Sequence, residues 1–310
     1  MKILVTGGAG FIGSQVVDAF IESGHEVIVF DDLSTGSKDN LNPRAKFYEV
    51  DITSPEAVEL VQKEQPAVLN HHAAQMDVRR SVADPAFDAH TNTLGLINLM
   101  EAFKKTGSAK KVIFASTGGA VYGEAKTIPT PEDYPAQPLS PYGISKLTSE
   151  HYLYYYHQVF NIPFVCLRYA NVYGPRQNPH GEAGVVAIFC QKMLKQKQTV
   201  INGSGEQTRD FIYVADIVKA NLVALNKNNS GIFNIGTAKE TSINTIFRVL
   251  NNLTGSKTPE NHGPAKDGEQ QRSCLDWQKA KQELNWQPEV ELAAGLAKTA
   301  EFFKSKIKPA

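Results

Sequence analysis

The stretch that decides the fold opens the chain, where residues 1–13 read MKILVTGGAGFIG. An apolar run, Ile3–Val5, leads directly into Gly7, Gly10 and Gly13, and apolar residues at helical spacing begin at Phe11. This Gly-x-x-Gly-x-x-Gly spacing allows a tight turn and lets a pyrophosphate approach the backbone N–H groups of a helix N-terminus. Such a turn can also join a strand to a helix without a ligand. Because the motif stands between a predicted strand and a predicted helix, we favour a dinucleotide site.

Short apolar runs alternate with longer segments of helical periodicity through the first half of the chain. The runs predict strands that are buried on both faces, at Ile3–Val5, Val27–Phe30, Ala67–Leu69, Val112–Phe114 and Phe164–Leu167. The longer segments predict helices over Phe11–Glu22, Ser54–Glu64, Phe87–Lys105 and Pro141–Phe160. This alternation is typical of an α/β fold, a doubly wound parallel sheet of the Rossmann type.

The pattern loosens after about Tyr169, where glycine- and proline-containing loops separate shorter elements. Helices are predicted here near Val185–Lys195, Asp216–Leu225, Ile243–Leu253 and Leu292–Phe303. We therefore expect a nucleotide-binding domain over residues 1–170 and a smaller, C-terminal substrate domain over residues 171–310. The boundary is approximate, and we expect the chain to cross back between the two.

Composition excludes several classes of function. The 310 residues carry 32 Lys+Arg and 32 Asp+Glu, so no basic excess exists to grip nucleic acid. The three cysteines are far apart and predict neither a metal site nor a disulfide framework, which favours a reducing, cytoplasmic location. No apolar run reaches about 18 residues, so no membrane span is expected. His71-His72 invites a metal interpretation, but adjacent strand residues face opposite sides, and we expect no metal.

Acidic residues follow the second predicted strand, at Asp31-Asp32. A carboxylate at this position can accept hydrogen bonds from the adenosine ribose hydroxyls and repels a 2′-phosphate, which favours NAD over NADP. An exposed aspartate in an ordinary turn is the alternative. Asp51-Ile52, just ahead of the helix predicted from Ser54, is placed to meet the adenine ring.

Tyr142 and Lys146 stand four residues apart at the start of a predicted helix. Residues at this spacing share a helix face, so the ammonium is expected to lower the pKa of the phenol and allow Tyr142 to act as a base or acid. A solvated pair on a helix surface is the alternative. Ser116 and Thr117 end the preceding strand, at the edge where open α/β sheets bind ligands, and offer a hydroxyl to the same reacting oxygen.

Taken together, these residues resemble the extended short-chain dehydrogenase/reductase family, and within it the nucleotide-sugar epimerases, above all those that act on UDP-glucose. The resemblance covers nearly the whole chain. Its motifs are TGGAGFIG (6–13), DDLSTG (31–36), HHAAQ (71–75), SPYGISK (140–146), LRYANVYGPRQNP (167–179), TRDFIYVADI (208–217) and GPAKDGE (263–269).

The resemblance implies 4-epimerisation of UDP-glucose and UDP-galactose with NAD, through a 4-keto sugar. Tyr142 would take the proton of the 4-hydroxyl, Thr117 would hydrogen-bond the same oxygen, and Lys146 would also hold the nicotinamide ribose. The NAD site would further include Phe11, Ile12, Asp31, Asp51, Ile52, Ala73, Ala74, Gln75, Asn92 and Tyr169. The nucleotide-sugar site would include Asn171, Arg209, Lys266 and Glu269. A homodimer through the helix that carries Lys146 is implied as well.

The hydroxyl loop departs from the family pattern, because it carries one residue more than usual between Phe114 and Val121. Counting from the strand gives Thr117, whereas counting back from Val121 gives Gly118, which has no hydroxyl. We therefore choose Thr117, with Ser116 as the alternative. Residues 118–120 are Gly-Gly-Ala and provide none of the acids that related dehydratases and decarboxylating synthases carry here.

Three further positions bear on the substrate. Asn178 stands where glucuronate epimerases tend to have a second arginine, so a neutral hexose fits better. Lys266 replaces an arginine and loses its bidentate fork toward the diphosphate. Ser273 is small and leaves room for an N-acetyl group, so a UDP-N-acetylglucosamine 4-epimerase is one alternative. Two others are a net NAD-dependent nucleotide-sugar oxidoreductase and a non-catalytic NAD-binding regulator.

Overall fold

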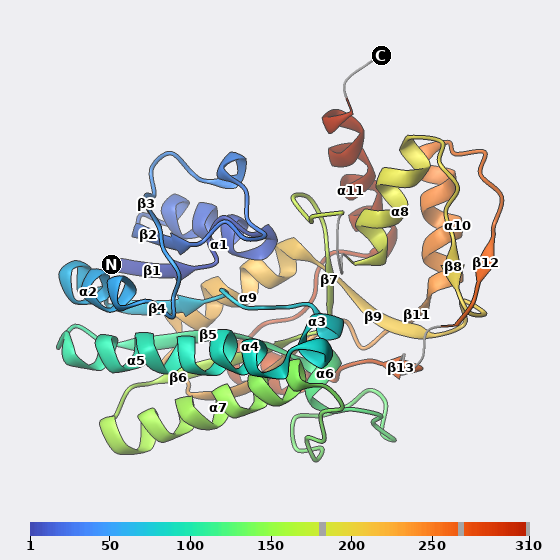
Figure 1. Cartoon of the computed structure of the whole chain (residues 1–310). Helices are drawn as coiled ribbons and strands as arrows, with labels where there is room; N and C mark the ends of the chain where they lie inside the picture. Colours follow the sequence, from blue (N-terminus) through green and yellow to red (C-terminus); the bar gives the residue numbers. More distant parts are fainter. Residues whose placement is uncertain (180–183, 266–269, 308–310) are drawn as a thin grey trace.

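A seven-stranded parallel sheet forms the centre of the computed structural model, which describes residues 1–179, 184–265 and 270–307 (Figure 1). Its strand order is β10-β6-β5-β4-β1-β2-β3. The strands are β1 (Lys2–Thr6), β2 (Glu26–Asp31), β3 (Lys46–Glu49), β4 (Val68–His71), β5 (Lys111–Thr117), β6 (Phe164–Tyr169) and β10 (Gly231–Ile235). All neighbouring pairs are parallel, which confirms the predicted doubly wound α/β fold.

Both faces of this sheet are covered by helices, because successive strand residues point to opposite faces. Ile3 and Val5 of β1 belong to the core formed with α1 (Phe11–Glu22) and α9 (Val214–Asn226), whereas Leu4 belongs to the opposite core. The helices of the opposite core are α2 (Pro55–Glu64), α5 (Gly95–Lys105) and α7 (Pro141–Phe160). Continuous apolar strands are thus buried on both sides, as their sequence predicts.

Helix starts follow local sequence signals. Ser54 caps α2 by accepting a hydrogen bond from the Ala57 N–H, and Ser140 caps α7 by accepting one from the Gly143 N–H. Each cap is followed by a proline at the first helical position, where its missing N–H costs nothing. The observed bounds of α1, α2 and α7 agree with the predicted ones.

The helix predicted over Phe87–Lys105 is present, but a π-helical turn interrupts its α-helical geometry. The structure has α4 (Pro85–Ala89), a π-helical turn over His90–Leu94, and then α5. Across the turn the Asn92 side-chain amide donates to the Asp88 carboxylate at 3.0 Å, and both side chains are buried. A short helix, α3 (Val78–Ala83), precedes them and was not predicted.

A second set of elements gathers around β9 (Thr208–Tyr213), which pairs with β7 (Asn171–Tyr173), β11 (Glu240–Ser242) and β13 (Arg272–Ser273). A two-stranded sheet joins β8 (Ile201–Asn202) to β12 (His262–Gly263). Helices α8 (Val185–Leu194), α10 (Ile243–Thr254) and α11 (Leu292–Lys306) pack into one apolar core, at the opposite end of the molecule from α2 and α5 (Figure 1). The smaller elements are η1 (Lys38–Asn40), α6 (Gly118–Val121), β12 and η3 (Ala280–Leu284).

The chain returns to the first sheet from this second set. Strand β10 pairs in parallel with β6, and the preceding helix α9 packs against α1. The central sheet therefore takes one edge strand from beyond residue 171. Within the described residues, no helix is both long and apolar enough to cross a membrane.

Candidate nucleotide and catalytic site

The glycine loop lies between the carboxyl end of β1 and the start of α1. Gly7 has φ +68°, and a Cβ there would lie 2.7 Å from the Ala73 nitrogen. A Cβ on Gly13 would lie 2.2 Å from the Gly7 carbonyl oxygen, so the first turn of α1 sits directly on the loop. Gly10 is the N-cap residue and supplies no side chain to cap the helix. The first-turn N–H groups of α1 therefore suit an anion such as a pyrophosphate.

Asp31 ties the end of β2 to the glycine loop. Its carboxylate accepts hydrogen bonds from the N–H groups of Ala9 and Leu33, each at 2.9 Å, and the residue is 7% exposed. Burial raises the pKa of Asp31, although these two N–H groups oppose the shift. Asp32 instead turns to Ser34 and accepts hydrogen bonds from its N–H and hydroxyl. Asp31 is thus the carboxylate at the loop, and Asp32 stabilises the exposed turn beside it.

Asp51 and Ile52 lie after β3 and begin the segment that leads into α2. The Asp51 carboxylate accepts hydrogen bonds from the N–H and the hydroxyl of Thr53, at 2.8 Å each. Ile52 is buried against Gly95, and its carbonyl accepts a hydrogen bond from the Asn98 side chain at 2.7 Å. Both positions are therefore fixed before any ligand binds.

Asn92 holds the segment that follows β4 in place. Its side chain accepts a hydrogen bond from the Gln75 N–H at 2.8 Å and donates to the Gln75 carbonyl at 2.9 Å. Gln75 in turn donates to Asp88. Ala73 donates its N–H to the Thr6 hydroxyl and lies against Gly7. The structure thus puts Ala73, Ala74 and Gln75 beside the glycine loop and puts Asn92 behind them.

Lys146 is buried and Tyr142 is half-buried on the first turns of α7. The Lys146 ammonium donates to the Ala115 carbonyl at 2.9 Å and lies 5.9 Å from the centre of the Tyr142 ring. Burial lowers the pKa of Lys146 to about 8, against the opposing charges of Asp88 and Glu150.

The prediction that Lys146 lowers the pKa of Tyr142 is wrong for this structure. Burial raises the pKa of the phenol, and the negative charge of Asp88 raises it further. The physical reason is that the phenol is poorly solvated, while the ammonium is held by a backbone carbonyl rather than by the phenol oxygen. In this state Tyr142 is a protonated phenol.

Thr117 is the hydroxyl that the loop after β5 leaves for the site. A Cβ on Gly119 would lie 3.9 Å from both the Thr117 hydroxyl and the Asn171 side-chain oxygen, so these two groups face a common space. Ser116, the alternative, donates its hydroxyl to the Glu150 carboxylate at 2.5 Å on the other side of the strand. Gly118 has no room for a side chain, because a Cβ there would lie 2.4 Å from Leu275.

Two of the predicted substrate residues, Asn171 and Arg209, are linked through β9. Asn171 on β7 is paired with β9, and Ser273 on β13 is in register with Arg209. The next residue, Asp210, is buried and accepts hydrogen bonds from the N–H groups of Thr237, Ala238 and Leu275, which fixes β9 against the loops on either side. Lys266 and Glu269 lie outside the described residues.

Tyr169, at the end of β6, lies under the same edge of the sheet. Its hydroxyl accepts a hydrogen bond from the Asn221 side chain at 2.8 Å and lies 3.3 Å from the His72 ring nitrogen. Burial raises the pKa of Tyr169 and lowers the pKa of His72 to about 3, so both groups are neutral. Of the described residues, no group of three or more His, Cys, Asp or Glu is arranged to hold a metal ion.

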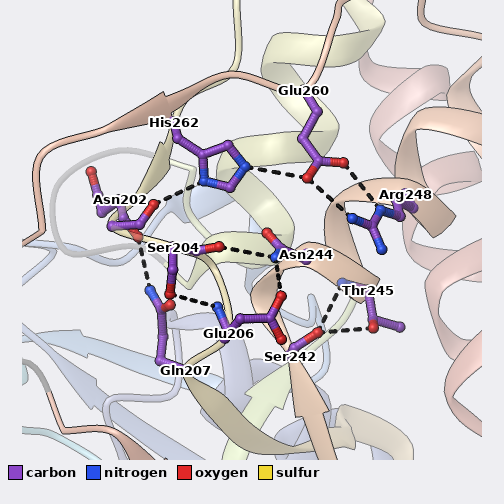
Figure 2. Close-up of polar contacts among 11 residues, drawn as sticks. Asn202, Ser204, Glu206, Gln207, Ser242, Asn244, Thr245, Arg248, Glu260 and His262 are labelled. Atoms are coloured by element: carbon purple, nitrogen blue, oxygen red, sulfur yellow. Dashed lines mark hydrogen bonds and ion pairs between the residues drawn. The ribbon is translucent and has the colours of Figure 1, made fainter.

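A polar cluster supports the loop that leads into β9 (Figure 2). His262 contacts the Gly203 carbonyl at 2.8 Å and Glu260 at 3.2 Å, and Glu260 also accepts hydrogen bonds from Arg248 of α10. Asn244 donates to the Ser204 carbonyl and to Glu206. The cluster fixes the turn before Arg209 to α10 and β12. The cluster joins residues 202–207 to residues 242–262, which are far apart in the sequence, so it could not be predicted from the chain.

Sequence reasoning also missed Glu150 and Arg168, although a signal was present. Glu150 follows Lys146 by four residues and Tyr142 by eight, on one face of α7, and Arg168 interrupts an otherwise apolar strand. The two form a buried ion pair at 2.6 Å behind the end of β5. A charged residue within a strand that is buried on both faces requires a partner.

Comparison with known proteins gives one consistent family. The profile of the NAD dependent epimerase/dehydratase family matches residues 3–236. A UDP-glucose 4-epimerase of Mycolicibacterium smegmatis is 43% identical over 312 residues, which cover 99% of each chain. The crystal structure of a Thermotoga maritima UDP-glucose 4-epimerase with UDP-glucose is 48% identical, with a TM-score of 0.97 over 99% of each chain. A Thermus thermophilus UDP-glucose 4-epimerase in complex with NAD is 39% identical, with a TM-score of 0.94 over 99% of this chain and 100% of the other.

Proposed function

The chain belongs to the NAD-dependent epimerase/dehydratase family, and we propose that it interconverts UDP-glucose and UDP-galactose by NAD-dependent 4-epimerisation. The observation that carries the proposal is the meeting of three features at one edge of the central sheet. These are the uncapped glycine loop at α1, the pair of half-buried Tyr142 and buried Lys146 on α7, and the Thr117 hydroxyl beside Asn171.

The residues present fit NAD. Gly7, Gly10 and Gly13 leave a side-chain-free cradle at a helix N-terminus, and Asp31 stands beside it as the acceptor for a ribose diol. Asp51, Ile52, Ala73, Ala74, Gln75 and Tyr169 are proposed to complete the site, with Asn92 as their support. Bound NAD supplies a hydride acceptor for C4 of the sugar and a donor that returns the hydride to the opposite face.

Tyr142, Lys146 and Thr117 are proposed to handle the proton of the 4-hydroxyl. The phenol oxygen of Tyr142 takes that proton as C4 is oxidised and gives it back when the 4-keto sugar is reduced. Since burial raises the pKa of the phenol, the step needs positive charge nearby, and the ammonium of Lys146 lies on the same helix face. Thr117 hydrogen-bonds the reacting oxygen, and Asn171 and Arg209 hold the nucleotide sugar, with Lys266 and Glu269 as further candidates.

Loss of water from the sugar is disfavoured by the loop that follows Thr117. A dehydratase needs an acid near the reacting carbons, but residues 118–120 are Gly-Gly-Ala. Gly118 cannot be replaced by an acid without displacing Leu275, which its Cβ would approach to 2.4 Å. The packing of this loop therefore favours simple return of the hydride.

UDP-N-acetylglucosamine is the second candidate substrate. Ser273 is in register with Arg209 on the neighbouring strand and is only 7% exposed, so its short side chain faces the interior rather than the solvent. A small residue beside the phosphate-binding arginine leaves space that a neutral N-acetyl group can fill.

The test is incubation of the purified protein with UDP-galactose and, separately, with UDP-N-acetylgalactosamine, without added cofactor, with products identified by NMR. An epimerase yields the corresponding glucose epimers with no accumulation of NADH. A net oxidoreductase instead stops once its bound NAD has been reduced to NADH, and a non-catalytic NAD-binding protein yields no product. Either of these results would refute the proposal.

A homodimer and a cytoplasmic location complete the proposed function. Helix α7 exposes an apolar stripe, Ile144, Tyr152, Tyr155 and Val159, which repeats at helical spacing and suits a second copy of the same helix. The three cysteines are free and buried, in keeping with a reducing compartment.

A further inference from the structure

A buried ion pair lies directly behind the proposed catalytic residues. Glu150 of α7 and Arg168 of β6 form two parallel hydrogen bonds, at 2.6 and 2.9 Å, and their side chains are 1% and 4% exposed. Burying two charges is costly even when the pairing is good, and apolar residues of similar size often serve stability equally well. Stability alone therefore does not account for this pair.

The segment from Ser116 to Tyr122 carries Thr117, and the ion pair binds this segment at each of its two ends. Glu150 accepts a hydrogen bond from the Ser116 hydroxyl at 2.5 Å, immediately before Thr117. Arg168 donates to the Tyr122 hydroxyl at 2.7 Å, immediately after α6. Since Ser116 and Thr117 point to opposite sides of the strand, fixing Ser116 from behind sets the direction of the Thr117 side chain.

The same network continues away from the site and anchors it. Tyr122 donates to the Asn234 side chain at 2.8 Å, and Asn234 of β10 donates from its own side chain to the Thr130 carbonyl at 2.9 Å. The Asn234 N–H donates to Glu132 at 2.7 Å. The ends of β5, β6 and β10 are thereby joined by polar contacts that are all satisfied.

Glu150 also faces Lys146 along α7. The two are four residues apart, and the negative charge of Glu150 is one of the influences that keep the pKa of Lys146 from falling further through burial. The other groups that act on Lys146 are Asp88, which also favours its charged form, and Cys166 behind it.

We infer that Glu150, bound to Arg168, is a positioning residue for the epimerisation, holding Thr117 and Lys146 in the geometry that the reacting 4-hydroxyl requires. The inference rests on the proposed function. Glu150 touches neither the sugar nor the cofactor; it acts through Ser116 and along the helix face. Removing it misplaces Thr117 and lets the ammonium of Lys146 lose its proton at lower pH.

The test compares kcat, KM and pH profile in Glu150→Gln, Ser116→Ala and Glu101→Gln. Glu150→Gln is expected to lower kcat about 100-fold, as a misplacement of about 1 Å does, with little change in KM. The fall of kcat on the alkaline side of its pH profile, which we call the alkaline limb, is expected to move to lower pH. Ser116→Ala lowers kcat but keeps the limb, because the ion pair stays. Glu101→Gln, which breaks the half-exposed pair of Glu101 with Lys104 within α5, leaves both kcat and its pH dependence unchanged.

A purely structural role predicts a different pattern. The double variant Glu150→Gln/Arg168→Met removes both charges and restores the thermal midpoint. If it also restores kcat and the alkaline limb, or if Glu150→Gln folds with wild-type values, the inference is overturned. If wild type itself epimerises no UDP-hexose, the proposed function fails, and nitrogen-15 NMR titration of Lys146 decides the inference instead: a lower pKa in Glu150→Gln supports it and an unchanged one overturns it.

Discussion

Gly13→Ala tests whether the glycine loop is the cofactor site. The Cβ of an alanine at residue 13 would lie 2.2 Å from the Gly7 carbonyl oxygen and 2.9 Å from its carbon. Both atoms are backbone, so no side chain can swing away. Because ordinary van der Waals contact begins near 3.4 Å, the loop and α1 must separate by about 1 Å.

This separation would move apart the two groups that would hold the pyrophosphate. The first-turn N–H groups of α1 would move relative to the turn at Gly7, which faces them from the end of β1. A misplacement of about 1 Å costs about 100-fold in binding or rate, which corresponds to about 2.8 kcal/mol. We therefore expect the affinity for NAD to fall by that factor.

The assay is NAD binding by isothermal titration calorimetry, with the thermal midpoint measured alongside. Gly24→Ala is the matched control at the other end of α1. Gly24 has φ +81° and nothing within 4 Å of its Cβ position, so alanine there costs about 1 kcal/mol of stability through the backbone and leaves the loop intact. Wild-type NAD affinity in Gly13→Ala, or equal losses in both variants, would refute the assignment.

Four further outcomes are expected. Tyr142→Phe lowers kcat about 10²–10⁴-fold in a coupled UDP-galactose assay and keeps NAD, because it removes only the proton acceptor; equal loss of NAD would contradict this. Activity falls as pH rises through about 8, where Lys146 loses its charge. A kcat that stays flat up to pH 10 would count against a need for the charge of Lys146. Since the unfolded chain binds that proton more tightly, the contribution of Lys146 to the free energy of unfolding rises with pH above 8. Ser273→Tyr abolishes turnover of N-acetylated sugars and spares UDP-galactose, as followed by NMR, and unchanged selectivity argues against the space beside Arg209. Val159→Asp, at an exposed position of α7, yields monomers in light scattering after gel filtration, whereas a persistent dimer places the interface elsewhere.

The sequence predicts those parts of the fold that depend on local signals. Helix α7 begins at Pro141 because Ser140 is a good cap and proline suits the first helical position, and both facts are visible in the chain. Strand β10 was not predicted, since a five-residue run bounded by loops becomes a strand only by pairing with β6. The π-helical turn at His90–Leu94 was missed for a similar reason, because contacts of Asp88 and Asn92 with distant segments hold it.

In the site, too, the features that depend on local spacing could be predicted, and those that depend on contacts between distant segments could not. Glycine spacing places the loop, and the four-residue spacing of Tyr142 and Lys146 places them on one helix face. The direction of the Tyr142 pKa could not be predicted, because it depends on burial and on Asp88 from another helix. The distinction between Ser116 and Thr117 depends on Glu150, which approaches the strand from one side only.

The return of the chain to β10 constrains how the protein is made. Strand β6 stays an open edge on the ribosome until Gly231–Ile235 emerges, and by then β7 and β9 have already been synthesised. Exposed edges pair readily with other chains, so pairing of β10 with β6 as soon as β10 emerges protects the nascent protein. A gene cut at the boundary between the two regions would therefore not release a self-sufficient nucleotide-binding module. The segment from β7 to β9 thus stands in the chain as an insertion between two neighbouring strands of the central sheet.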